Sequence, residues 1–182
     1  NGEKKNPDVT PGIGVVKALE LGYKNFVLSQ DTSISIEKYI KQNGGTVFRS
    51  KAAEVNVVEK MIETKSQAGG EGSSGGFFFS DFNYFRDGIL TSGLIASIIK
   101  KDSLVDALNF MEKYHLLRDK VEYDSKYHDS ILEALDKKMK EKYGNVETLD
   151  GLKVIIDEDS WALVRKSNTE NAIRISAESN SL

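Results

Sequence analysis

The fold class is decided by residues 25–48, which read NFVLSQDTSISIEKYIKQNGGTVF. A short apolar and β-branched run at each end predicts a strand, and the helical apolar period between them begins after the capping residue Ser33 and stops at Gly44. Further helices are predicted on either side, over residues 10–21 and 54–62. Helices that alternate with short strands indicate an α/β domain with a largely parallel sheet.

This alternation stops near residue 101. A short helix, a strand, a charged helix over residues 130–143 and three short strands are predicted beyond that point. We therefore predict an α/β domain over residues 10–101 and a smaller α+β domain over residues 102–182. Residues 1–9 contain no apolar period and are predicted to be the remainder of a linker from a preceding domain.

The composition narrows the possible functions. Of the 182 residues, 39% are hydrophobic and 29% are charged, which is the balance of a soluble globular protein. A net charge of -3 with scattered basic residues argues against a nucleic-acid binder. No apolar run predicts a membrane span or a signal peptide, so we expect a cytoplasmic protein that binds neither nucleic acid nor membrane. The lack of cysteine and the two isolated histidines exclude disulfides, thiolate nucleophiles, and Cys-type or three-His zinc sites.

Residues 68–76 read AGGEGSSGG, a glycine-rich run that we predict to be a loop. The run contains the G-x-G-x-x-G spacing of a dinucleotide site, but FFF at residues 77–79 predicts a buried strand where that site needs a helix. A nucleotide-binding domain is therefore the weakest of our hypotheses. The run offers one carboxylate, Glu71, and two hydroxyls, which suit the neighbouring hydroxyls of a sugar. An ordinary flexible surface loop is the alternative.

A second polar run, RKSNTE at residues 165–170, lies between two predicted strands. It offers a guanidinium fork, an ammonium, two hydroxyls and an amide, and its turn-prone residues can point backbone N–H groups inward as an anion nest. Together these groups are the inventory of a site for a phosphate monoester. A polar hairpin turn without a ligand is the alternative.

Several runs resemble, in order, motifs of the third and fourth domains of the α-D-phosphohexomutase family, which contains phosphomannomutases, phosphoglucomutases and phosphoglucosamine mutases. KAAEVNV at residues 51–57, GGEGS at 69–73 and RDGIL at 86–90 resemble a strand-to-helix stretch, the sugar-binding loop and the helix start after it. TLDGLKV at 148–154 and WALVRKSNTE at 161–170 resemble a strand and the phosphate loop of the last domain. The resemblance implies an α/β/α domain with a mixed, largely parallel sheet, followed by a domain like that of the TATA-box-binding protein.

The activity that this resemblance implies is isomerisation: a phosphoryl group moves between C1 and C6 of a hexose, through a phosphoserine and a hexose 1,6-bisphosphate. The residues that it assigns to substrate binding are Glu71, Ser73, Arg165, Ser167, Asn168 and Thr169. The first two of these are expected to hold sugar hydroxyls and the other four the phosphate that is not reacting. Further candidates are Glu54, Ser74, Lys166 and Arg174. The alternative for Glu54 is a carboxylate favoured at a helix N-terminus, and for Lys166 and Arg174 it is an exposed position without a ligand.

Two motifs of the family are missing from the sequence: the phosphoserine loop of its first domain and the Asp-rich magnesium loop of its second. We therefore expect the C-terminal part of a four-domain enzyme, inactive on its own and with its last domain truncated. The missing N-terminal domains are its expected partners. They are expected to supply the catalytic serine and the oxygen ligands of Mg2+, so no catalytic or metal-binding residue is expected in this chain. The alternative hypothesis is a stand-alone, non-catalytic module that binds sugar phosphates.

Overall fold

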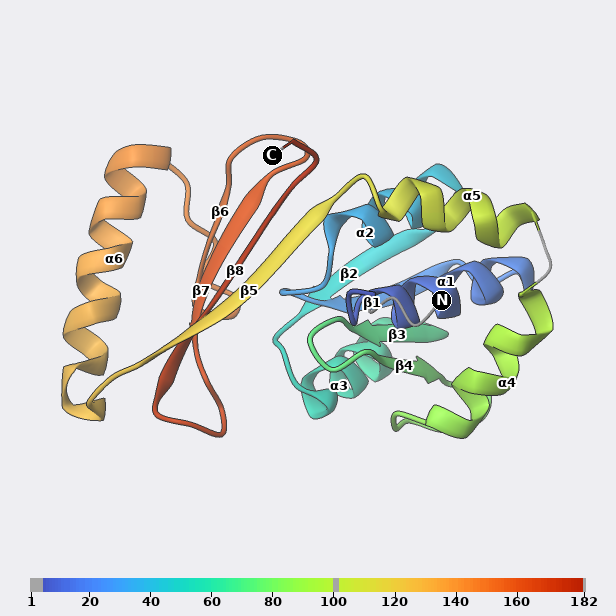
Figure 1. The fold of residues 1–182 in the computed structure, drawn as a ribbon. Helices are drawn as coiled ribbons and strands as arrows, with labels where there is room; N and C mark the ends of the chain where they lie inside the picture. The colour runs from blue at the N-terminus through green and yellow to red at the C-terminus, as the bar shows by residue number, and fades with distance from the viewer. Residues whose placement is uncertain (1–4, 100–101, 182) are drawn as a thin grey trace. The chain divides into compact units, whose positions relative to one another are not determined.

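The computed structural model describes residues 5–99 and 102–181 and divides the chain into two compact units (Figure 1). The first unit ends at Tyr114, and the second begins at His115. Each unit has its own sheet, so each is described by itself.

The boundary in the structure differs from the one that we expected at residues 101/102. Lys101 itself lies outside the described residues. The division comes later because helix α5 (Asp102–Met111) packs on α1 (Val9–Glu20) in the first unit. Leu104, Ala107 and Met111 share one face of α5, and all three are buried in the core of that unit.

The first unit is an α/β/α domain with a mixed sheet. Its remaining elements are β1 (Asn25–Ser29), α2 (Ile34–Gln42), β2 (Thr46–Ser50), α3 (Glu54–Thr64), β3 (Ala68–Glu71), β4 (Gly76–Phe79) and α4 (Gly88–Ile98). The strand order is β2-β1-β3-β4; β1 is parallel to both of its neighbours, and β4 is antiparallel to β3. The predicted alternation of helices and strands, and the largely parallel sheet, are confirmed.

Alternating side chains of the sheet pack against helices on its two faces. Phe26 and Leu28 of β1 belong to one buried cluster with residues of α1, α2, α4 and α5. Val27, which points to the other face, packs in a second cluster with Val57 and Met61 of α3. The predicted cap of α2 is confirmed, because the hydroxyl of Ser33 accepts a hydrogen bond from the backbone N–H of Ser35 at 3.1 Å.

The prediction that residues 68–76 form a loop throughout is wrong for the first part of this run. Residues 68–71 form β3, an interior strand of the sheet that is buried along its whole length. A Cβ atom on Gly69 would lie 2.6 Å from the sulfur of Met61, and one on Gly70 would lie 3.1 Å from Leu28. The two glycines therefore serve close packing between helices and sheet, and not flexibility.

The second unit is an α+β domain with an antiparallel sheet. Its elements are β5 (His115–Glu122), η1 (Ser125–Tyr127), α6 (His128–Tyr143), β6 (Leu152–Ile155), β7 (Trp161–Lys166) and β8 (Ala172–Ser179). The strand order is β5-β8-β7-β6. Trp161 is a core residue that is 1% exposed. Its buried indole N–H has a partner, because it donates to a carboxylate oxygen of Glu178 at 2.7 Å.

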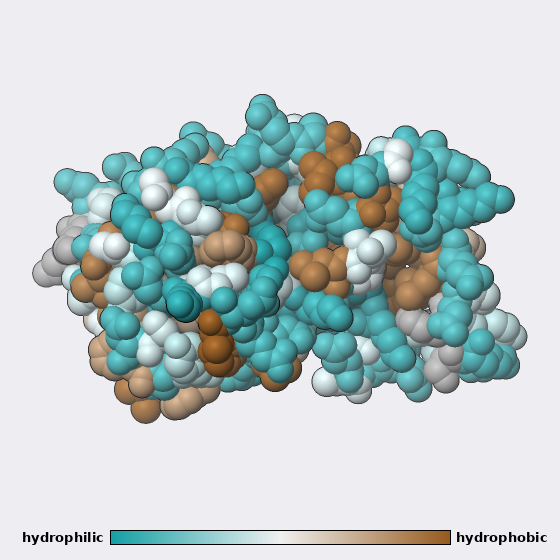
Figure 2. Space-filling view, turned by 180° about the vertical axis from the view of Figure 1, so that it is seen from behind, coloured by the Kyte–Doolittle hydropathy of each residue, from teal (hydrophilic) through white to brown (hydrophobic). Residues whose placement is uncertain are grey.

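Hydrophilic residues cover most of the face of the molecule that Figure 2 shows. Within residues 5–99 and 102–181, none of the helices is long and apolar enough to cross a membrane.

Candidate functional site

The first candidate cluster lies at the β3–β4 turn. Glu71 is the last residue of β3, and it is 7% exposed although its side chain is a carboxylate. The Ser74 hydroxyl donates to Oε2 of Glu71 at 2.8 Å across the turn. The structure therefore brings two of the candidate residues into contact, while Ser73 lies half-buried between them in the sequence.

A basic side chain outside the predicted set of binding residues holds this cluster together. Arg86 Nε lies 2.9 Å from Oε2 of Glu54, and the backbone N–H of Arg86 donates to the other oxygen of Glu54 at 3.1 Å. The same guanidinium lies 3.6 Å from Oε2 of Glu71. Glu54, the first residue of α3, is therefore in the cluster through Arg86, which the sequence indicated only as part of a motif. A hollow of about 510 Å3 opens here, lined among others by Glu54, Ser74 and Arg86.

The turn is tied to the end of β1 by its backbone. The N–H of Gly72 donates to the hydroxyl of Thr32 at 2.9 Å, and Thr32 is fully buried. A Cβ atom on Gly72 would lie 2.3 Å from the carboxylate of Asp8, which accepts a hydrogen bond from the N–H of Ser33 at 2.7 Å. Glycine at residue 72 thus allows the buried carboxylate of Asp8 to lie against the turn. This packing helps to fix the position of Glu71 at the end of β3.

The second candidate cluster lies at the β7–β8 turn of the second unit. Arg165 is 8% exposed, near the end of β7, and its Nε lies 3.8 Å from Oδ2 of Asp150. Ser167 is 2% exposed, and its N–H donates to the carbonyl of Ala172 at 2.9 Å. Because this N–H closes the turn, it is not available for the anion nest that we predicted.

The remaining candidates of this turn are exposed. Asn168 and Thr169 lie at its tip, and Lys166 is the exposed last residue of β7. The carbonyl of Lys166 accepts a hydrogen bond from the guanidinium of Arg165 at 3.3 Å. The Lys166 side chain is exposed to solvent beside the turn.

Gly151 brings a neighbouring segment against Arg165. Its φ is +81°, and a Cβ atom there would lie 2.3 Å from the carbonyl oxygen of Val164 and 2.7 Å from the Cβ of Arg165. Only a residue without a side chain fits this position. The close approach places Asp150, the preceding residue, within ion-pair distance of Arg165.

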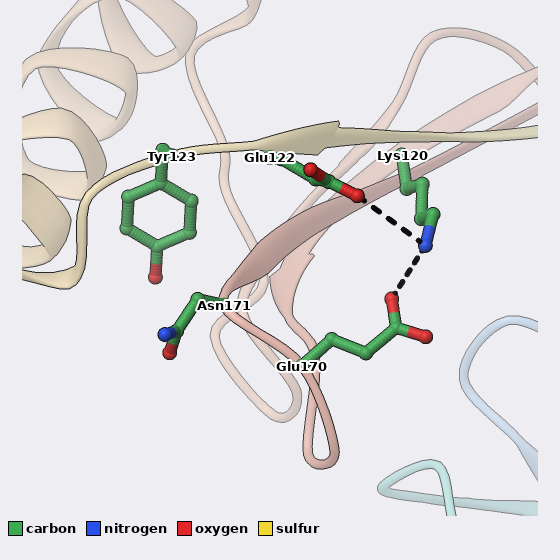
Figure 3. A pocket seen from close by; sticks show the side chains of 5 residues that line it. All are labelled: Lys120, Glu122, Tyr123, Glu170 and Asn171. Carbon is green, nitrogen blue, oxygen red and sulfur yellow. Dashed lines mark hydrogen bonds and ion pairs between the residues drawn. The ribbon is translucent and has the colours of Figure 1, made fainter.

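Arg174 contacts the turn from β8. Its Nε donates to the hydroxyl of Ser167 at 3.1 Å, and its Nη2 lies 3.7 Å from Oε1 of Glu170. Lys120 on β5 lies 2.8 Å from the other oxygen of Glu170 (Figure 3). The hydrogen bond from Lys120 lowers the pKa of the Glu170 carboxyl, and the same contact raises the pKa of the Lys120 ammonium. Lys120 was not among the predicted site residues, because a contact across 50 residues depends on strand pairing that a single sequence does not display.

Two family models match the chain. The model described as phosphoglucomutase/phosphomannomutase, alpha/beta/alpha domain III, matches residues 13–114. The model described as phosphoglucomutase/phosphomannomutase, C-terminal domain, matches residues 117–182. The two matches meet where the structure divides the chain.

Curated relatives cover the same residues. A protein named "Probable phosphoglucosamine mutase" from Methanosphaera stadtmanae is 33% identical over 84% of this chain and 34% of its own length. A phosphoglucomutase/phosphomannomutase from Thermococcus kodakarensis is 34% identical over 82% of this chain and 33% of its own length. The chain thus spans about a third of the length of these relatives.

Solved structures share the fold. A phosphoglucomutase/phosphomannomutase family protein from Burkholderia thailandensis has a TM-score of 0.74 to this chain at 24% identity. The match covers 97% of this chain and 38% of that protein.

Proposed function

The chain belongs to the phosphoglucomutase/phosphomannomutase family, and we propose that it binds the phosphorylated hexose on which such a mutase acts. The observation that carries this proposal is the arrangement around Arg165: the residue is 8% exposed, Arg174 lies directly opposite it on β8, and Arg174 donates to the hydroxyl of the buried Ser167. A buried arginine fork next to hydroxyl donors is the arrangement that recognises a phosphate monoester.

The two clusters have different roles in this proposal. Arg165, Ser167, Asn168 and Thr169 hold the phosphate, with Arg174 as a further cation. Glu71 and Ser73 hold hydroxyls of the sugar, because a carboxylate accepts hydrogen bonds from two neighbouring hydroxyls. Ser74 and Glu54 complete the surroundings of Glu71 through the contacts described above.

For the whole mutase, we propose the reaction that the family resemblance implies. A phosphoserine outside these 182 residues donates its phosphoryl group to the free hydroxyl of the hexose phosphate, and the resulting bisphosphate returns its other phosphoryl group to the serine. C1 and C6 of the sugar must each reach the serine in turn. Binding of the sugar hydroxyls and of the phosphate that is not reacting therefore uses binding energy to orient the sugar. In this proposal, the chain binds the sugar hydroxyls and the phosphate that is not reacting, and it supplies no reacting group.

The described residues do not fit a magnesium site. Within residues 5–99 and 102–181, no group of three His, Cys, Asp or Glu side chains lies close enough together to hold a metal ion. As the family resemblance implies, we propose that the Mg2+ site of the mutase lies in residues outside this chain. The cytoplasmic location of the protein stays a prediction.

Titration calorimetry of the 182-residue chain tests the proposal. We expect glucose 6-phosphate, mannose 6-phosphate or glucosamine 6-phosphate to bind, and glucose and NAD not to bind at the same concentrations. We also expect no conversion of glucose 1-phosphate to glucose 6-phosphate by the chain alone. Binding of NAD or ATP in preference to every hexose phosphate would contradict the proposal.

Replacing Arg86 with alanine tests the proposed role of the first cluster. The change frees Glu54 and Glu71 from their shared cation, so the Glu71 carboxylate loses its fixed position. We expect the affinity for glucose 6-phosphate to fall about two- to fivefold, the size of effect typical of a half-exposed ion pair, while that for inorganic phosphate stays unchanged. Lys60→Ala, which breaks an ion pair of 2.8 Å elsewhere in the same unit, is the control. An equal loss of affinity for glucose 6-phosphate and for inorganic phosphate would show that Arg86 does not position the Glu71 carboxylate for binding the sugar.

A further inference from the structure

Cations from neighbouring strands face one another across the sheet of the second unit. Lys120 of β5 pairs with Arg174 of β8, and Arg174 pairs with Arg165 of β7. Directly opposite residues of antiparallel strands point to the same face of a sheet, with their Cβ atoms about 4.5–5.5 Å apart. Lys120, Arg174 and Arg165 therefore form a row of positive charges along one face, which we call the cation row.

Folding alone disfavours such a row, because like charges directly opposite one another in a sheet destabilise it. Three carboxylates offset these charges. Glu170 bridges Lys120 and Arg174 at 2.8 and 3.7 Å, Glu122 lies 3.8 Å from Lys120, and Asp150 lies 3.8 Å from Arg165. Only Glu170 contacts two of the cations in these ion pairs.

The cation row lies beside a hollow, and one of its residues contacts the β7–β8 turn, the candidate phosphate site. A hollow of about 530 Å3 is lined by Lys120 and Glu170, together with Glu122, Tyr123 and Asn171 (Figure 3). Arg174, in the middle of the row, donates to the hydroxyl of Ser167 in the β7–β8 turn. An anion that reaches Ser167 and Arg165 therefore also meets the electrostatic field of Arg174 and Lys120.

We propose that Lys120 is a phosphate-binding residue of this site, and that Glu170 is a resident carboxylate which the phosphate of the ligand displaces from Lys120 and Arg174. This inference rests on the proposed function. A phosphate monoester carries close to two negative charges at pH 7, so it offers Lys120 and Arg174 more negative charge than the single carboxylate of Glu170 that it displaces. The surrounding contacts keep Lys120 and Glu170 ionised, so the exchange is between anions and involves no proton transfer.

The test compares two pairs of variants of the 182-residue chain. Lys120→Ala and Glu170→Gln change the cation row, while Lys126→Ala and Asp124→Asn change an exposed ion pair of the same length, 2.8 Å, elsewhere in the unit. Affinities for inorganic phosphate and for glucose 6-phosphate are measured at fixed low ionic strength. Thermal unfolding of each variant verifies that it is folded.

Lys120→Ala is expected to weaken the binding of both ligands about two- to fivefold, as the loss of one half-exposed ion-pair partner allows, and Glu170→Gln to strengthen it by a similar factor. Neither control is expected to change it. Equal affinities for Lys120→Ala and Lys126→Ala would overturn the role of Lys120. Weaker binding by Glu170→Gln would overturn the displacement, because Glu170 would then support the site. If the unaltered chain binds neither ligand, the proposed function itself fails.

Discussion

Replacing Arg165 with alanine is expected to weaken the binding of glucose 6-phosphate by about 10- to 150-fold, since hydrogen bonds to charged groups contribute about 1.5 to 3 kcal/mol. The effect is large because Arg165 is 8% exposed, so water replaces its contacts poorly. The measurement is titration calorimetry with glucose 6-phosphate and, separately, with inorganic phosphate. Both affinities fall together, because the proposed contact is with the phosphate.

Two further variants separate the fork of Arg165 from its charge. Arg165→Lys keeps the positive charge and loses the planar pair of donors, so an intermediate affinity is expected. Lys140→Ala removes one positive charge from α6 of the same unit, where Lys140 pairs with Asp136, and is expected to bind like the unaltered chain. An Arg165→Ala variant that is folded and binds as well as Lys140→Ala would refute the assigned phosphate site.

The second large effect concerns Gly151. Gly151→Ala is expected to destabilise the second unit by about 2 to 5 kcal/mol, because it adds backbone strain at φ +81° to a clash with the carbonyl of Val164 at 2.3 Å. For a unit of this size that corresponds to a fall in melting temperature of roughly 8 to 40 °C. Thermal unfolding followed by circular dichroism measures it.

Gly144 provides the matched control for this experiment. Its φ is +80°, almost the same as that of Gly151, but a Cβ atom there would meet nothing within 4 Å. Gly144→Ala therefore reports the cost of a positive φ without a clash, and a larger loss for Gly151→Ala is expected from its clash. If both substitutions lower the melting temperature equally, close packing against β7 is not what requires glycine at residue 151.

Much of the fold could be predicted from the sequence, because its signals are local. The cap at Ser33, the stop at Gly44 and the apolar period between them specify α2 without reference to the rest of the chain. The interior strand β3 could not be predicted in this way. Ala68, Gly69 and Gly70 have no β-branched or aromatic side chain, and they form a strand through pairing with β1 and β4, which is a tertiary contact.

The candidate site residues likewise fall into those that local sequence indicates and those that only the tertiary fold reveals. Glu71 and Arg165 could be selected from short runs whose residue types suit a sugar and a phosphate. Arg86 and Lys120 could not, because each acts on a carboxylate that lies far away in the sequence and comes close only through the tertiary fold. Short runs of the sequence thus indicate candidate ligand-binding groups, and the tertiary fold is needed to identify the side chains that contact those groups.

Arg86 and Asp87 are neighbours in the sequence with separate partners. Arg86 holds Glu54 and Glu71, while the Asp87 carboxylate accepts a hydrogen bond from the N–H of Leu90 at 2.8 Å and caps α4. The turn that carries Glu71, the start of α3 and the first turn of α4 are thereby coupled into one cooperative unit for local unfolding. We therefore expect a ligand that binds Glu71 to slow amide hydrogen exchange in α4, a helix that the ligand does not have to contact.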